Sequence, residues 1–269
     1  MRSLTKWIAG GVGAGLLAAV VMYAPASWLA SHIEQATSGQ VLLQAPRGTA
    51  WRGSADLVLT GGAGSSGQVA LPTRLYWQMS PARLGLNVQL HSACCALAAS
   101  PILLGLRLDG LGLPPDMTWR FDAQNVVLPA ELLVGLGAPW NTLQLSGTLK
   151  LVSEGLAGRW SSSEGLTSMT GRATLEMLEV ATALSTVRPL GSYRLVSTGA
   201  VMQLETLGGA STDAALLLSG TGKIERGRLG FLGEALPAAG REEALSNLLH
   251  IVGQWQTSAD GRARAILKL

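Results

Sequence analysis

The amino-acid sequence predicts a mainly β protein, in which a single N-terminal transmembrane helix is followed by a curved, repetitive antiparallel β-sheet domain with a few short helices. Three observations lead to this fold class. The chain has a long uncharged stretch near its start, apolar and polar residues alternate along much of the remaining chain, and a glycine recurs at the start of the alternating runs.

The uncharged stretch runs over residues 7–31, WIAGGVGAGLLAAVVMYAPASWLAS. About 20 apolar residues are enough to cross the hydrocarbon core of a bilayer, so we expect this stretch to be a membrane anchor. Arg2 and Lys6 precede it, and Glu34 is the first charged residue after it. The positive-inside rule therefore predicts a cytoplasmic N-terminus.

This topology divides the chain into a cytoplasmic segment, residues 1–6, the anchor, and a domain outside the cytoplasm, residues 32–269. Because no low-complexity linker follows residue 40, we expect that domain to be one unit. The alternative to an anchor is a cleaved signal peptide, since Ala24-Pro25-Ala26 imitates an A-x-A cleavage site.

Small residues form one face of the predicted anchor helix. Gly11 and Gly15 make a G-x-x-x-G pair, and Ala14 and Ala18 lie on the same side. Such faces allow two helices to approach closely, so these four residues are a candidate helix-pairing face. The alternative is the general abundance of glycine in membrane helices.

Alternation with a period of two is typical of strands that have one buried and one wet face. In RLYWQMS it places Leu75, Trp77 and Met79 on one face, and the next run, LGLNVQL, alternates in the same way after a turn. The run MTWRFDAQNVVL repeats the pattern. These segments predict antiparallel strands.

Five segments begin with a glycine that is followed by an alternating run: RGTAWRGSADLVL, SGTLKLVSEG, TGRATLEMLEV, SGTGKIERGRLG and DGRARAILKL. Glycine at the start of a strand permits the bend or bulge that a curved sheet needs. We therefore expect Gly48 and Gly53 to be bend points, with the ring of Trp51 packed between them on the inner face of the first strand. Residues 128–137 and 240–253 are expected to be short helices that cap the sheet.

The ionisable residues do not suggest catalysis. Lys and Arg number 20 against 17 acids, which is a small and scattered excess that does not predict nucleic-acid binding. The three His residues have no metal-ligand spacing, and no nucleophile elbow occurs. We expect a protein without enzymatic activity, catalytic residues, metal or cofactor.

Cys94 and Cys95 are the only cysteines. Outside the cytoplasm they could form a vicinal disulfide, pair between chains, or stay as small buried thiols. Five of the eight Trp residues also allow two interpretations, namely a sheet core that is poor in Phe or the lining of an apolar groove for an acyl chain. They are Trp51, Trp77, Trp119, Trp140 and Trp160.

Several phrases occur together in one order: GTAWRGSA, LYWQMSPARLGL, LGAPWNTLQLSGTL, LSTVRPLGSYRL, LSGTGKIE and LSNLLHIVGQ. In this the chain resembles the N component of the bacterial type II secretion system over nearly its whole length. The motif residues that carry the resemblance, and to which it implies structural roles, are Gly48, Trp51, Gly53, Gly137, Pro139, Trp140, Asn141, Pro189, Gly191 and Tyr193.

The resemblance implies a non-enzymatic accessory subunit of the inner membrane that supports the export of folded periplasmic proteins across the outer membrane. Its implied partners are other inner-membrane subunits of the secretion system and the lipid bilayer. An alternative function is an envelope protein that binds lipid or another hydrophobic ligand on an apolar sheet face, which rests on analogy with large curved-sheet envelope proteins.

Overall fold

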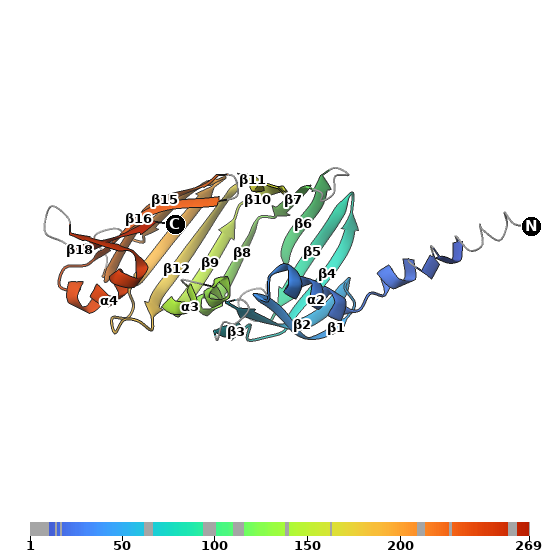
Figure 1. Cartoon of the computed structure of the whole chain (residues 1–269), viewed down its shortest axis with the longest axis horizontal. Coiled ribbons are helices and arrows are strands. Elements are labelled where there is room, and N and C mark those ends of the chain that lie inside the picture. Colours follow the sequence, from blue (N-terminus) through green and yellow to red (C-terminus); the bar gives the residue numbers. More distant parts are fainter. Residues whose placement is uncertain are drawn as a thin grey trace, which may run out of the picture.

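The computed structural model describes residues 11–13, 15–16, 18–61, 67–93, 101–109, 116–137, 140–161, 163–208, 213–225, 228–257 and 263–268. These residues form antiparallel strands and a few short helices, as the alternation predicts, but the strands make two nine-stranded sheets and not the one curved sheet that the sequence predicts. The sheets follow one another along the long axis of the molecule, and the N-terminal segment continues that axis beyond one end (Figure 1).

The first sheet has the order β1-β2-β4-β5-β6-β7-β10-β11, with β3 paired to β2. Its strands are β1 (Val41–Gly48), β2 (Arg52–Thr60), β3 (Gln68–Ala70), β4 (Leu75–Ala82), β5 (Gly85–Ser92), β6 (Ile102–Asp109), β7 (Asp116–Phe121), β10 (Leu156–Ser161) and β11 (Gly165–Thr170).

The second sheet has the order β17-β18-β16-β15-β14-β13-β12-β9-β8. Its strands are β8 (Gln124–Pro129), β9 (Leu145–Ser153), β12 (Arg172–Thr182), β13 (Gly191–Thr198), β14 (Val201–Thr206), β15 (Leu216–Glu225), β16 (Arg228–Pro237), β17 (Gln254–Thr257) and β18 (Ala263–Lys268). The helices are α2 (Ala26–Ala36), the 3₁₀ helix η1 (Ala130–Leu136), α3 (Trp140–Leu143) and α4 (Glu242–Val252).

The two sheets are joined by strands that bend from one into the other. The chain passes from β7 to β8, from β9 to β10 and from β11 to β12 with only one or two residues between the strands. Gly171 lies at the third bend with φ +90°, and a Cβ there would collide with the backbone carbonyl of Gly155, which lies in the second bend between β9 and β10. Glycine is therefore required where these two bends approach each other.

Gln124 completes the pairing at the first bend. Its side-chain Oε1 accepts a hydrogen bond from the Leu103 backbone N–H at 3.0 Å, and its Nε2 donates to the Leu103 carbonyl at 3.4 Å. The side chain thus replaces a backbone partner for β6 where β8 turns away into the second sheet.

We call the face of the sheets on which α2 and α4 pack the inner face, and the opposite face the outer face. At the first end, Ala26 and Ala30 of α2 pack with Leu43, Ala55 and Trp77. At the other end, α4 buries three leucines against the second sheet. That second cluster comprises Leu143, Leu190, Ala215, Leu216, Ala235, Leu245, Leu248, Leu249 and Ala265.

Of the two short helices predicted to cap the sheet, one is an α-helix as expected and the other is not. Residues 242–252 form α4, whose apolar side is buried against the sheet as the leucine spacing predicts. Residues 130–136 form a 3₁₀ helix and not an α-helix. A segment this short gains little from the α-helical hydrogen-bond pattern, and tighter i→i+3 turns are common in such connectors.

Candidate functional site

The loop between β1 and β2 holds the N-terminal segment. The indole N–H of Trp51 donates to the Val21 carbonyl at 2.7 Å, and the Ala50 backbone N–H donates to the Ala24 carbonyl at 2.8 Å. Pro25 and Thr49 form an isolated antiparallel bridge beside them. The expectation that Trp51 packs on the inner face of a strand is therefore wrong, because its half-exposed ring lies in a turn and contacts the preceding segment.

Trp77 occupies the buried position instead. Its side chain is only 4% exposed, and its indole N–H donates to the Ala50 carbonyl at 3.0 Å. A Cβ on Gly53 would lie 2.5 Å from this ring and 2.7 Å from the Arg47 carbonyl. Gly53 therefore lets the loop lie directly on Trp77, while Gly48 provides the turn with φ +89°.

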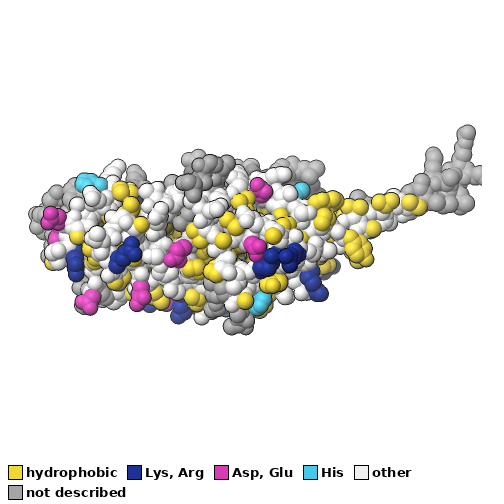
Figure 2. Space-filling view, turned by 90° about the horizontal axis from the view of Figure 1, so that it is seen from below, with side chains coloured by type: hydrophobic (Ala, Val, Ile, Leu, Met, Phe, Trp, Pro, Cys, Tyr) yellow, Lys and Arg dark blue, Asp and Glu magenta, His cyan; other side chains and the backbone are white. Residues whose placement is uncertain are grey.

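The segment that the sequence predicts to be an anchor is divided by Pro25. Residues 18–22 are helical, Tyr23 donates the last helical N–H to the Ala19 carbonyl at 2.9 Å, and α2 begins at Ala26. Hydrophobic side chains line the projecting segment (Figure 2). In the part of the chain that the structure describes, no single helix has both the length and the apolarity for a membrane crossing.

The candidate helix-pairing face lies in this projecting segment. A Cβ on Gly11 or on Gly15 would meet no atom within 4 Å, and Ala18 is exposed. Ala14 lies outside the described residues. The described part of this face is thus not covered by any other residue that the structure describes.

The phrase around Trp140 forms the connection between β8 and β9. Gly137 ends η1 with φ +78°, and its carbonyl accepts the Asn141 backbone N–H at 3.1 Å. Trp140 is partly buried against the cluster beneath α4. Pro139 lies outside the described residues.

The phrase around Tyr193 joins β13 to β15. The Leu190 carbonyl accepts the Leu216 N–H at 2.9 Å, and the Tyr193 hydroxyl donates to the Leu216 carbonyl at 3.0 Å. A Cβ on Gly191 would lie 3.0 Å from that hydroxyl oxygen, and Pro189 follows a cis peptide bond. Burial raises the pKa of Tyr193 far above its ordinary value of 10.0.

No catalytic constellation is assembled from the side chains that the structure describes. His32, His91 and His250 are exposed on three separate elements, α2, β5 and α4. Among the described residues, no three His, Cys, Asp or Glu side chains are grouped as metal ligands would be. Cys94 and Cys95 lie outside the described residues.

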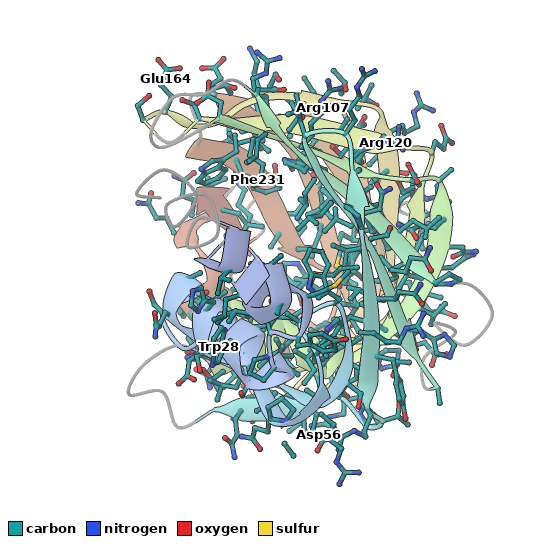
Figure 3. The ribbon with its side chains drawn as sticks, turned by 90° about the vertical axis from the view of Figure 1, so that its right-hand side faces the viewer. Trp28, Asp56, Arg107, Arg120, Glu164 and Phe231 are labelled. Atoms are coloured by element: carbon teal, nitrogen blue, oxygen red, sulfur yellow. The ribbon has the colours of Figure 1, made fainter. Side chains whose placement is uncertain are left out.

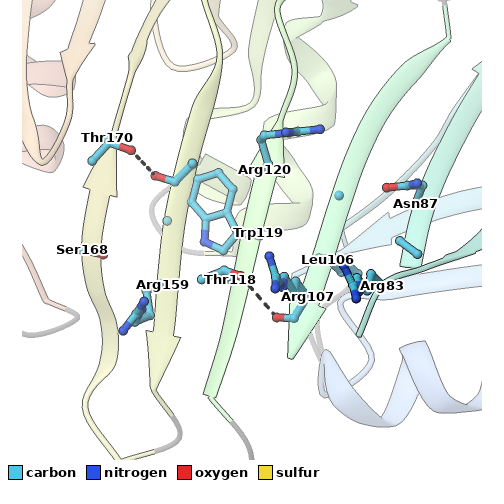
Figure 4. Close-up of a pocket in the computed structure, with 14 residues that line it drawn as sticks. Arg83, Asn87, Leu106, Arg107, Thr118, Trp119, Arg120, Arg159, Ser168 and Thr170 are labelled. Carbon is cyan, nitrogen blue, oxygen red and sulfur yellow. Dashed lines mark hydrogen bonds between the residues drawn. The ribbon is translucent and has the colours of Figure 1, made fainter. Parts of the chain in front are cut away.

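A shallow hollow of about 480 Å³ lies on the outer face of the first sheet (Figure 4), and four arginines line it: Arg83, Arg107, Arg120 and Arg159. Arg120 pairs with Asp122 at 2.8 Å and Arg159 with Asp109 at 3.5 Å. Arg83 and Arg107 have no carboxylate within 4 Å among the described residues.

This hollow could hold an anionic group, since guanidinium groups bind carboxylates and phosphates. Sequence reasoning missed it because its arginines come from three strands and a turn. The available signal was their alternation with inward apolar residues, for example Arg120 between Trp119 and Phe121. Viewed along the long axis, Arg107 and Arg120 lie on the outside of the curved sheets, whereas Phe231 lies inside (Figure 3).

The outer face of the second sheet carries alternating charges instead. The Glu176 carboxylate forms ion pairs with Lys150 at 3.7 Å and with Arg194 at 3.1 Å. Arg194 also forms an ion pair with Glu205 at 3.4 Å. These four residues are cross-strand neighbours in register. Their charges balance within the row, so the first sheet presents the more basic outer face.

The described residues thus form an elongated antiparallel β protein with an apolar projecting segment and a charged outer face. The chain belongs to the family of type II secretion system (T2SS) protein N, whose model matches residues 10–264. This membership links the protein to type II secretion and to the cell envelope. Searches of curated proteins and of solved structures found no match.

Proposed function

We propose that the protein is a non-enzymatic accessory component of the inner-membrane part of the type II secretion system, where it supports export of folded periplasmic proteins. The observation that carries this proposal is the family match over residues 10–264, which includes the projecting apolar segment as well as both sheets. Such a protein acts by binding its neighbours.

The proposal places the N-terminus in the cytoplasm and the sheets in the periplasm. Residues 26–31 of the predicted anchor belong to α2, where Ala26 and Ala30 are buried on the first sheet. The membrane-crossing part is then the portion before Pro25. The span from Trp7 to Tyr23 is within the range of lengths that can cross a bilayer with little tilt.

Two surfaces are suited to partner subunits. Gly11 and Gly15 offer a small face to a partner helix in the membrane. The arginine-lined hollow offers Arg83 and Arg107 to acidic groups of a periplasmic partner. The two surfaces lie on different sides of the proposed bilayer interface, so they can be tested separately.

The proposal is tested by deletion and by crosslinking in the native membrane. A deletion strain should export less of a folded periplasmic substrate, and the intact gene should restore export. A photocrosslinker at Arg107 should capture another secretion subunit, whereas the same probe at the exposed Leu232 serves as a control on the second sheet. Unchanged export, together with no crosslink to any secretion subunit, would refute the proposal.

A second candidate function is the binding of an apolar ligand on the inner face. Between the two helix-covered clusters this face carries apolar side chains that are only partly buried, including Leu104, Phe121, Leu151, Leu175 and Leu195. No charged side chain interrupts them in these strands, because the charges lie on the alternate positions.

Lipid extraction from the purified full-length chain tests this alternative. After exchange into a lipid-free detergent, mass spectrometry should detect a stoichiometric phospholipid or fatty acid, and Leu151→Glu should abolish it. Lys150→Glu is the matched control, since it places the same carboxylate one residue away on the outer face. Absence of bound lipid would exclude the alternative and leave the secretion role intact.

A further inference from the structure

Aromatic and apolar side chains surround the point where the projecting segment meets the first sheet. Met22 is 70% exposed, Tyr23 76% and Trp28 54%. Trp51 stands beside them because its indole N–H is bound to the Val21 carbonyl. Exposed side chains of this size, gathered at one place, indicate a contact with something outside the chain.

The hydrogen bonds fix this arrangement. The carbonyls of the last turn of a helix have no partner within the helix, and here Val21 and Ala24 receive donors from the loop between β1 and β2. The loop is in turn held by Trp77, which donates to Ala50, and by the Met79 N–H, which donates to the Trp51 carbonyl at 2.7 Å. Hydrogen bonds from the loop between β1 and β2 thus join the projecting segment to the first sheet.

The charged side chains of the loop at the junction are both positive, and the acid that follows along the N-terminal segment is Glu34 of α2. Residues 18–33 contain no Asp, Glu, Lys or Arg, and the loop 47–53 contains only Arg47 and Arg52. Both arginines are exposed. In strand register, Arg47 lies opposite Ser54 and Arg52 opposite Gln78, on the outer face of the sheet.

We propose that Met22, Tyr23, Trp28 and Trp51, together with Arg47 and Arg52, form a collar that binds the phospholipid headgroup layer of the bilayer. This rests on the proposed function, because the occupant is identified by continuity with the anchor that the segment is proposed to form. Tyr and Trp prefer the interface between hydrocarbon and water, and guanidinium groups bind phosphates. The all-positive charge favours a surface that contains anionic lipid.

The collar also sets the orientation of the domain. The projecting segment continues the long axis of the sheets (Figure 1), so a headgroup layer at Tyr23 and Trp28 makes the sheets stand away from the bilayer. Neighbouring strands are about 4.8 Å apart, and the successive strands therefore reach on the order of 60 Å from the membrane surface. The end that contains α4 and β17 is then the distal end.

Site-directed spin labelling of the full-length chain in nanodiscs of phosphatidylcholine and phosphatidylglycerol tests the collar. With Cys94 and Cys95 replaced by Ser, single labels are placed by Leu16→Cys, Ser27→Cys and Leu232→Cys. Collisions with oxygen and with a water-soluble nickel chelate report depth. We expect residue 16 to lie in hydrocarbon, residue 27 at the headgroups with a loss of nickel accessibility, and residue 232 in water.

Two variants make the test specific to the collar. Trp28→Ala combined with Trp51→Phe should move label 27 toward the accessibility of label 232, whereas Trp160→Ala, which removes a half-exposed Trp from β10, should leave it unchanged. If label 27 matches label 232 in the unaltered collar while label 16 lies in hydrocarbon, the collar is refuted and the anchor stands. If label 16 lies in water, the anchor is refuted and the collar with it.

Discussion

Removing the hydroxyl of Tyr193 should destabilise the second sheet measurably. β14 ends at Thr206 and its register with β15 ends at the pair Glu205 and Ser219, so the Leu216 carbonyl lies past the part of β15 that β14 pairs. The Tyr193 hydroxyl supplies the donor at 3.0 Å from a side chain that is 2% exposed. Because Tyr193→Phe leaves this buried carbonyl unsatisfied, its cost exceeds the about 0.5–1.5 kcal/mol of a typical net hydrogen bond and reaches up to roughly 3 kcal/mol.

We therefore expect Tyr193→Phe to lower the free energy of unfolding by about 1.5–3 kcal/mol. The assay is urea unfolding of the full-length chain in mild detergent, monitored by far-UV circular dichroism. Tyr76→Phe is the matched control, because Tyr76 is half-exposed on the outer face and should change stability by less than about 0.5 kcal/mol. Equal effects for the two variants would refute the assignment of the hydroxyl.

The same residue predicts a pH dependence. Burial raises the pKa of Tyr193 in the folded state, so the unfolded chain releases its phenolic proton at lower pH. The stabilisation is complete below the unfolded pKa of about 10 and is lost as pH rises above it. Between pH 9 and pH 11 the free energy of unfolding of the unsubstituted chain should fall by about 1.4 kcal/mol more than that of Tyr193→Phe. Equal decreases in the two proteins would contradict this prediction.

Three further changes test the packing. Gly53→Ala should cost about 1–3 kcal/mol through overpacking against Trp77, while Gly105→Ala, whose added Cβ would have its nearest neighbours at 3.8 Å, should cost much less in the same urea assay. A fragment that begins at residue 32 should unfold at lower urea than one that begins at residue 24, because it lacks Ala26 and Ala30, which α2 packs against the first sheet; equal midpoints would contradict the role of α2. Glu176→Lys places three cations in one row and should cost up to about 1 kcal/mol at low salt, with partial recovery at 1 M salt; a salt-independent effect would exclude an electrostatic cause.

Local patterns predicted the strands well. Leu75, Trp77 and Met79 share one face because period-two alternation follows directly from strand geometry. The buried leucines of α4 were predictable for the corresponding reason in a helix. In both cases the information lies within a few neighbouring residues.

Contacts between distant segments were not predictable in this way. Trp51 and its acceptor Val21 are 30 residues apart, and no periodicity connects them. The glycines around Trp51 indicated a turn, but the ring that they accommodate belongs to Trp77 on the next strand. The arginine-lined hollow likewise depends on the register of β6, β7 and β10, which side-chain alternation alone leaves undetermined.

The order of the strands bears on how the chain can fold. From β1 to β16, with the short β3 set aside, each strand lies beside its predecessor in sequence or continues into the other sheet through a bend. The chain can therefore add one strand at a time in the order of its sequence. Pairings of this kind close short loops and favour rapid folding. The last step departs from this order, because β18 inserts between β16 and β17. The edge of the second sheet that contains β17 is therefore completed only when β18 is added.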